Sequence, residues 1–177
     1  MYAEEYKRKL VSAEEAVKVV KSGDIVDYGF FNGKPVVCDQ ALAKRTDLRD
    51  VQIYTAVSLP PVPEAAKVKG SFIYNDWQFS KVSRILQSYG LCNYVPILYH
   101  DACRLYREGI APHRNVAIAQ VAPMDKYGYF NLGPQNSETL ANMQVADTVI
   151  VEVNKNQPIC LGGAEESVHI SLIDYIV

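Results

Sequence analysis

Two short runs of β-branched and small apolar residues, Val116 to Val121 and Thr148 to Val153, constrain the fold of this chain more than any other feature. Each run is long enough for a strand and too short for a helix of ordinary length. Between them lie a turn at 125–128, a loop at 133–137 and a polar-started run at 138–145 that can form about two helical turns. The segment therefore predicts two buried parallel strands joined by a loop and a helix.

The rest of the chain also alternates between strand-like and helix-like patterns. Ser12 and Glu15 form a capping box that predicts a helix from Ala13 to Ser22, where Gly23 ends it. Further strands are predicted at 24–30, 51–57 and 72–74, and further helices from Pro35 onward and at 64–68, 79–88 and 102–107. Alternating strands and helices predict an α/β fold with an open, mostly parallel sheet flanked by helices, and no linker divides it.

Composition agrees with one soluble cytoplasmic domain. A chain of 177 residues can bury a real core, and its net charge of -2 is dispersed, so neither nucleic acid nor a membrane is expected as a partner. A charged start and the lack of a long apolar run predict a cytoplasmic location. The four cysteines (Cys38, Cys92, Cys103 and Cys160) are scattered, which favours reduced apolar packing over zinc and leaves a reactive thiol as the alternative.

Several phrases carry a family resemblance. AIAQVAPMDKYGYFNLGPQNS, VADTVIVEVN and CLGG, together with the opening segment at 11–45 and the closing HISLIDYIV, resemble the amino-terminal half of the acetyl-CoA hydrolase/transferase family. Within it, the chain is most similar to the butyryl-CoA:acetate and 4-hydroxybutyrate CoA-transferases. The resemblance spans nearly the whole chain and implies a NagB/RpiA/CoA-transferase-like sheet.

The resemblance also implies that this chain lacks the carboxy-terminal half of such enzymes. Members of this family are more than twice as long, and their catalytic glutamate and glycine-rich CoA loops lie in the carboxy-terminal half. Residues 1–177 are therefore expected to be an amino-terminal domain without a catalytic residue, inactive alone, which works with its own carboxy-terminal domain and as a homo-oligomer. The implied substrates are an acyl-CoA thioester and a short-chain carboxylate, and neither a metal nor an organic cofactor is required.

The loop at 29–35 is the first candidate for contact with substrate. Gly29 and Gly33 let the backbone approach a ligand, Asn32 offers a neutral donor, and the amides at the following helix start can hold an anionic oxygen. From the residues alone, a plain tight turn is the favoured interpretation, since the motif is neither GxGxxG nor a Walker loop. The resemblance implies that this loop faces the active site.

A second loop, at 133–137, follows the strand of the family motif. Asn136 or Ser137 can cap the next helix, and capping and ligand contact can coexist. The resemblance implies that this loop lines the acyl pocket, with Asn131, Gly133, Asn136 and Ser137 as contacts. Ser58 is a further polar residue after a strand, although its hydroxyl can equally serve only to close a turn.

Other polar residues are weaker candidates. His100 is a possible base but more commonly such a histidine is a capping or partly buried group. Glu152, at the end of a strand, and the pair 165–166, in what is expected to be a solvated loop after two glycines, are interpreted as structural rather than nucleophilic. His169 lies in an apolar run, where packing in the core is expected.

Three functions remain open from the sequence. The first is a CoA-transferase domain, with an acyl-CoA hydrolase of the same family as its variant, since a hydrolase differs only in letting water replace the second acid. The second is a sugar-phosphate isomerase, which would require a lysine or carboxylate base beside a phosphate loop, and Lys34 is the only obvious lysine so placed. The third is a non-catalytic module that binds a partner chain.

Overall fold

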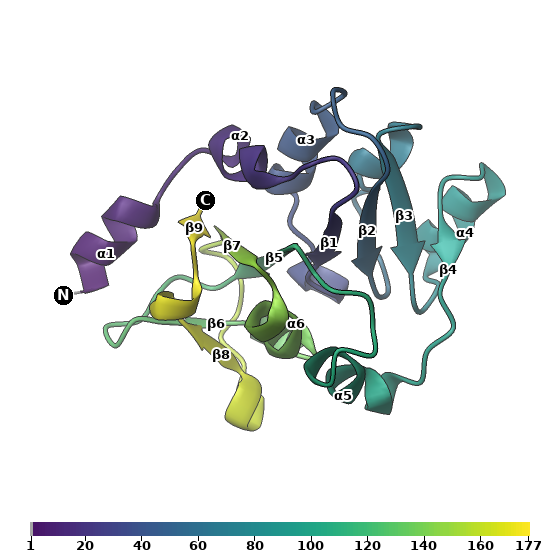
Figure 1. Ribbon diagram of the computed structural model, residues 1–177. Helices are drawn as coiled ribbons and strands as arrows, with labels where there is room; N and C mark the ends of the chain where they lie inside the picture. The colour runs from purple at the N-terminus through teal and green to yellow at the C-terminus, as the bar shows by residue number, and fades with distance from the viewer. Residues whose placement is uncertain (1) are drawn as a thin grey trace.

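A parallel sheet lies between two groups of helices in the computed structural model, which describes residues 2–177 (Figure 1). The strands are β1 (Ile25–Tyr28), β2 (Val51–Thr55), β3 (Phe72–Asp76), β4 (Asn93–Tyr94), β5 (Val116–Val121), β6 (Tyr129–Asn131), β7 (Thr148–Val153), β8 (Ser167–His169) and β9 (Tyr175–Ile176). The α-helices are α1 (Tyr2–Lys9), α2 (Ala13–Ala16), α3 (Val37–Ala43), α4 (Lys81–Ser88), α5 (Ala102–Arg107) and α6 (Thr139–Val145). The α/β class and both strands of the family motif, β5 and β7, are as predicted.

Seven strands form the main sheet in the order β4-β3-β2-β1-β5-β7-β9, and every neighbouring pair is parallel. The chain first builds outward from β1 to β4 and then returns to add β5 on the other side of β1. Loops after β1 and β5 therefore leave the sheet in opposite directions, and the crevice between their carboxyl ends is where such sheets bind ligands.

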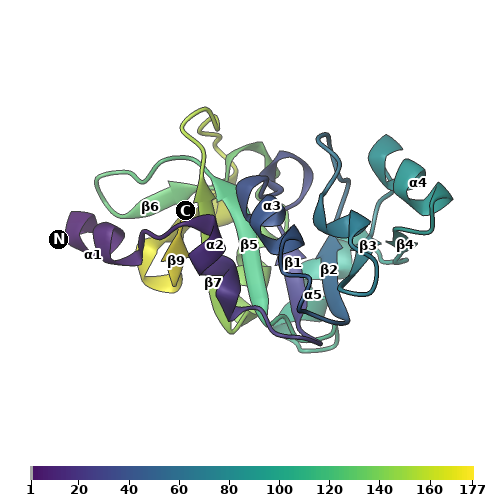
Figure 2. The ribbon, with the colours of Figure 1, turned by 90° about the horizontal axis from the view of Figure 1, so that it is seen from above.

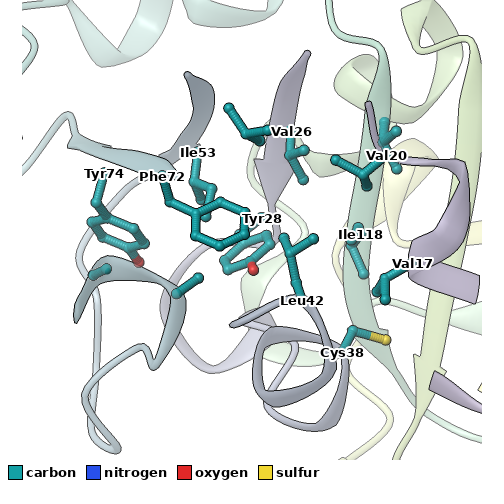
Figure 3. Close-up of a cluster of buried hydrophobic side chains, with 14 of the residues drawn as sticks. Val17, Val20, Val26, Tyr28, Cys38, Leu42, Ile53, Phe72, Tyr74 and Ile118 are labelled. Carbon is teal, nitrogen blue, oxygen red and sulfur yellow. The ribbon is translucent and has the colours of Figure 1, made fainter. Parts of the chain in front are cut away.

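Helices cover both faces of the sheet. The segment with α2 and α3 lies on one face, and α5 and α6 lie on the other (Figures 1 and 2). Figure 3 shows the core under α2 and α3, where side chains of the helical segments meet those of the strands. Ile118 and Leu42 in this core are fully buried, and burial of each such side chain stabilises the fold by roughly 1.5–3 kcal/mol.

Several elements are shorter than the sequence predicts. The Ser12 hydroxyl accepts the amide of Glu15 as expected, but α2 ends at Ala16, passes into a 3-10 turn at Val17–Val19 and does not reach Ser22. The β-branched Val17, Val19 and Val20 disfavour a longer α-helix. β2 ends at Thr55 rather than at Val57, because Val57 has a left-handed backbone with φ of 52°.

The amino-terminal helix and a small second sheet escaped prediction. In α1, Tyr6 stacks on Phe130 with ring centroids 6.1 Å apart, and Tyr2 meets the edge of His169 at 5.2 Å. β6 and β8 pair antiparallel in this sheet. The prediction that His169 packs in the core is wrong: its ring is only half-buried, between Tyr2 and Tyr129, because it faces the outer side of the small sheet. These elements depend on contacts between segments far apart in the sequence.

None of the helices formed by residues 2–177 is both long enough and apolar enough to cross a membrane.

Candidate functional site

The loop after β1 packs closely against the loop that follows β6. Gly29 has no room for a side chain, because a Cβ there would lie 2.4 Å from the Gly33 carbonyl oxygen. Gly33 is equally restricted, since its Cβ would lie 2.0 Å from the buried side chain of Gln135. Both glycines are therefore required by close approach, and the two loops that the sequence indicates as site loops lie in contact at the switch point.

A third segment, 154–163, completes this region. The Asn32 amide donates to the Gln157 side-chain oxygen at 3.5 Å, and a Cβ on Gly133, whose φ is 67°, would lie 2.5 Å from the Gln157 side-chain nitrogen. Gln157 is buried and its nitrogen has no partner within the described chain. Sequence reasoning missed Gln157, although it lies just ahead of the CLGG phrase, which could have drawn attention to it.

Asn131 and Asn136 hold the third segment against the second loop. The Asn131 side-chain oxygen accepts the amides of Gly133 at 2.8 Å and Cys160 at 3.0 Å, while its nitrogen donates to the Cys160 carbonyl at 2.9 Å. The Asn136 side chain donates to the Gly162 carbonyl at 3.2 Å. Both predicted contact residues thus have loop-bracing bonds of their own in this structure, and Asn136 remains partly exposed.

Ser137 lies at the outer side of the same loop. Its hydroxyl is within hydrogen-bond distance of the Tyr99 hydroxyl and donates to the Glu138 carboxylate at 2.6 Å. Its backbone has φ of 40°, a conformation uncommon for a residue other than glycine. Tyr99, from the 3-10 turn before α5, is a further polar group at this loop that the sequence did not indicate.

Ser58 does not present its hydroxyl to the other site residues. The side chain is only 1% exposed, and its hydroxyl shares a hydrogen bond of 2.8 Å with the Tyr74 hydroxyl. The Ser58 amide donates to Asp76 at 3.2 Å, which closes the turn after β2. A substrate contact by this hydroxyl would therefore need a local rearrangement.

The amides at the start of α3 are not available to a ligand, which corrects the expectation that they hold an anionic oxygen. The buried Glu152 carboxylate accepts the amides of Val36 at 3.0 Å, Val37 at 2.9 Å and Cys38 at 2.9 Å. Gln120 donates to the same carboxylate at 3.1 Å. These amides have no partner within the helix, and the Glu152 carboxylate takes the place that a bound anion would have there.

Lys34 is also buried and hydrogen-bonded within the fold. Its side chain is 4% exposed, and its ammonium group donates to the carbonyl oxygens of Leu59 and Pro61. Burial lowers the pKa of Lys34. An ammonium group held by two carbonyls of a neighbouring turn is poorly placed to act as the base or phosphate ligand of an isomerase.

The remaining candidate acids and bases lie at the rim. Glu166 accepts the amides of Gly162 at 2.6 Å and Gly163 at 3.0 Å, and Glu165 pairs with Arg107 at 2.5 Å, so neither is simply solvated as predicted. The partner of Glu165 comes from α5, whereas the partners of Glu166 lie in its own turn. His100 is exposed, 3.8 Å from Asp101.

The cysteines are all unpaired, and two of them, Cys38 and Cys92, are buried. Burial raises the pKa of both thiols, that of Cys92 to about 12, which leaves them protonated and unreactive. No group of three or more His, Cys, Asp or Glu side chains suited to a metal ion forms within residues 2–177.

A cleft of about 490 Å³ opens beside the site at the carboxyl ends of β5 and β7. Gln120, Glu152, Asn154 and the exposed Lys155 are among its lining residues. Amide and hydroxyl groups therefore dominate the site, and its three loops meet at the switch point of a parallel sheet. Such an arrangement can orient a polar ligand but offers no free nucleophile among the carboxylates described above.

The fold and the position of these loops define a CoA-transferase-like α/β domain. RipA from Yersinia pestis superimposes with a TM-score of 0.87 at 30% identity, covering 99% of this chain and 43% of that one. A 4-hydroxybutyrate CoA-transferase from Porphyromonas gingivalis gives a TM-score of 0.71 at 25% identity, covering 100% of this chain and 41% of its own. The chain belongs to the acetyl-CoA hydrolase/transferase family, whose amino-terminal domain model matches residues 1–177.

Curated relatives carry the names of CoA-transferases. A butyryl-CoA:acetate CoA-transferase of Anaerostipes caccae is 45% identical over 99% of this chain, and a 4-hydroxybutyrate coenzyme A transferase of Clostridium kluyveri is 34% identical over the same share. This chain spans 40% and 41% of their lengths. It thus corresponds to less than half of each relative.

Proposed function

We propose that this chain is the amino-terminal part of an enzyme that moves CoA between a short-chain acyl-CoA and a carboxylate such as acetate, butyrate or 4-hydroxybutyrate. The observation that carries the proposal is the meeting of the loops at 29–35 and 133–137 at the β1–β5 switch point. Similarity to transferases named for butyryl-CoA and acetate supports the choice of substrates. A cytoplasmic location and neither metal nor organic cofactor form part of the proposal.

The proposed reaction is a ping-pong exchange. A glutamate carboxylate attacks the acyl-CoA thioester carbonyl, which gives an acyl-glutamyl anhydride and releases CoA thiolate. The thiolate then attacks the glutamyl carbonyl and expels the first acid, leaving a glutamyl-CoA thioester. A second carboxylate takes the CoA by the same steps in reverse. Each attack forms a tetrahedral oxyanion, and one well-placed donor to such an oxyanion is worth about 3–4 kcal/mol.

In this proposal the chain provides pocket walls rather than the nucleophile. Glu152 is bonded to three amides, Glu166 to two, and Glu165 to an arginine, so these carboxylates are already engaged in the fold. We assign contact with the acyl group or the carboxylate to Asn32, Asn136 and Ser137, because these three neutral residues are only partly buried. The nucleophilic glutamate then belongs to a carboxy-terminal domain, and the complete enzyme is expected to be a homo-oligomer.

The direct test measures CoA transfer from butyryl-CoA to acetate. The 177-residue chain alone is expected to show none, and a chimera that joins it to the carboxy-terminal part of the Anaerostipes caccae relative is expected to show transfer. In the chimera, Asn32→Ala should lower the rate by more than Lys69→Ala, because Lys69 is exposed and away from the loops. Turnover by the isolated chain would contradict the proposal, and CoA release without an acceptor acid would favour a hydrolase.

A further inference from the structure

Glu138 has a buried carboxyl group that lacks the partners an ionised carboxylate needs. Its side chain, at the start of α6, is 1% exposed. One oxygen accepts the Ser137 hydroxyl at 2.6 Å, and the other is buried without a hydrogen-bond partner. A buried carboxylate with one bond is costly, and such groups commonly take up a proton instead.

Asn142, one helical turn later, also has a buried side-chain oxygen without a hydrogen-bond partner. Its side-chain nitrogen donates to Asp27 at 2.8 Å, which fixes the orientation of the amide, and its oxygen is a buried acceptor with no donor. Residues four apart on a helix lie on the same face. Two acceptors thus lie unpaired on one buried face of α6, and a single proton on Glu138 would supply the donor that both lack.

The charges around Glu138 agree with a neutral acid. It faces Asp27 of β1, Arg114 before β5, and Tyr106 and Cys103 of α5. The Arg114 guanidinium donates hydrogen bonds to Asp27 at 2.9 Å, to the Tyr106 hydroxyl at 2.6 Å and to the carbonyl of Pro112 at 2.6 Å. One cation therefore faces two buried acids and hydrogen-bonds to only one of them.

Burial raises the pKa of Glu138 to about 7, with Asp27 repulsion adding to it and the Ser137 bond and Arg114 opposing it. At neutral pH a large share of the molecules would therefore carry this proton.

The acid is linked directly to the second site loop. Ser137, its hydrogen-bond donor, has the strained φ of 40°, and the Asn136 side chain accepts the Ser137 amide at 2.8 Å. The Ser137 hydroxyl also reaches the Tyr99 hydroxyl at the surface. A strained residue persists only where its surroundings fix it, and Glu138 is the buried part of those surroundings.

We propose that Glu138 is a positioning residue held as a neutral carboxylic acid, whose proton bridges to the Asn142 side-chain oxygen and fixes the Asn136–Ser137 loop. Loss of that proton would break the bridge to Asn142 and leave a buried anion facing Asp27, which would shift the Asn136–Ser137 loop. The consequence for substrate contact rests on the proposed function, whereas the proton and its effect on the loop do not.

The test is an NMR titration of the 177-residue chain with ¹³C-labelled glutamate carboxyls. The signal of Glu138, assigned by its loss in Glu138→Gln, should titrate with a midpoint near pH 7, compared with about 4.3 for an ordinary glutamate. The Ser137 and Asn136 amide signals should shift with the same midpoint. A midpoint within half a pH unit of the ordinary value would overturn the proposal.

Two variants keep the test decisive. Glu138→Gln is a neutral mimic that can donate to Asn142 and accept from Ser137, so its loop amides should resemble the low-pH wild type and stop responding to pH near 7. Ser137→Ala removes a donor that favours the ionised form, so the midpoint should rise further. Assigning the Glu138 carboxyl through its own side-chain and backbone signals keeps this result independent of whether Glu138→Gln folds. A midpoint that falls or stays in Ser137→Ala would contradict the arrangement.

The titration uses no substrate, so it stands or fails independently of the CoA-transfer assay. If the titration behaves as expected and the chimera shows no transfer, the buried acid is supported and the proposed function is not. If the chimera is active and Glu138 titrates normally, the reverse holds.

Discussion

The carboxylate of Glu152 in β7 accepts the backbone amide of Cys38 in α3 at 2.9 Å, across a sequence separation of 114 residues. Together with the Val36 and Val37 bonds, this contact joins the end of one strand to the start of a helix on the far side of the switch point. The sequence suggested that the amides at this helix start bind substrate, but the protein's own Glu152 carboxylate already binds them.

Glu152→Ala should strongly destabilise the fold, because it leaves three amides and the Gln120 side chain without their acceptor. We expect the free energy of unfolding to fall by about 3 kcal/mol, the upper end of what an unsatisfied buried group costs. Urea denaturation followed by fluorescence of Trp77, the single tryptophan, measures this. Glu108→Ala, which removes an exposed ion pair, should change stability by no more than about 0.5 kcal/mol. Equal losses of stability in the two variants would show that the hydrogen bonds of Glu152 do not stabilise the fold as predicted.

Gly29→Ala should disturb both site loops, because the new Cβ would meet the Gly33 carbonyl 2.4 Å away and Ala119 at 2.9 Å. Neither neighbour is the flexible end of a side chain, so a loss of roughly 1–3 kcal/mol is expected. Amide chemical shifts of Gly33 and Gln135 should move as well. Gly23→Ala is the comparison, since it meets no atom within 4 Å and only its φ of 83° opposes it. Shifts at Gly33 in the Gly23 variant, or none in the Gly29 variant, would argue against the close contact.

Lys34→Met should loosen the turn after β2, because the ammonium bonds to Leu59 and Pro61 are lost while the carbonyls stay in place. Hydrogen bonds to charged groups are worth about 1.5–3 kcal/mol, so a loss in that range is expected in urea denaturation. Lys69→Met, at an exposed position, is the matched control and should be nearly neutral. If both variants behave alike, the Lys34 ammonium does not hold this turn.

Asp27 should make stability depend on pH. Burial raises its pKa to about 6 in spite of the Arg114 ion pair, compared with about 3.9 in an unfolded chain. The folded state therefore binds the proton more tightly, so stability falls as pH rises from about 4 to about 6, by on the order of 2–3 kcal/mol, and then levels off. Glu138 continues the decline toward pH 7.

The variant Asp27→Asn separates these two acids. It should flatten the dependence of stability between pH 4 and 6, because the amide resembles the neutral acid and takes up no proton in that range. Thermal unfolding measured from pH 4 to 8 in both proteins provides the comparison. A variant that keeps the wild-type slope below pH 6 would assign that slope to another group.

Local patterns in the sequence determined the regular elements. The apolar runs at β5 and β7 and the helical run at α5 were predicted at the bounds that the structure has, because periodicity and burial of such runs are properties of neighbouring residues. Ser12 could be identified as a cap for the same reason. The parallel α/β class followed from the alternation of these elements.

Only the tertiary structure decided which polar groups are free. Glu152 belongs to a strand, and nothing local shows that it meets α3; Lys34, Asn131 and Ser58 likewise find their partners across the chain. The pairing of β6 with β8 has the same origin. A hydrogen-bond partner depends on which segments the fold brings together, and that information does not lie within any short stretch of sequence.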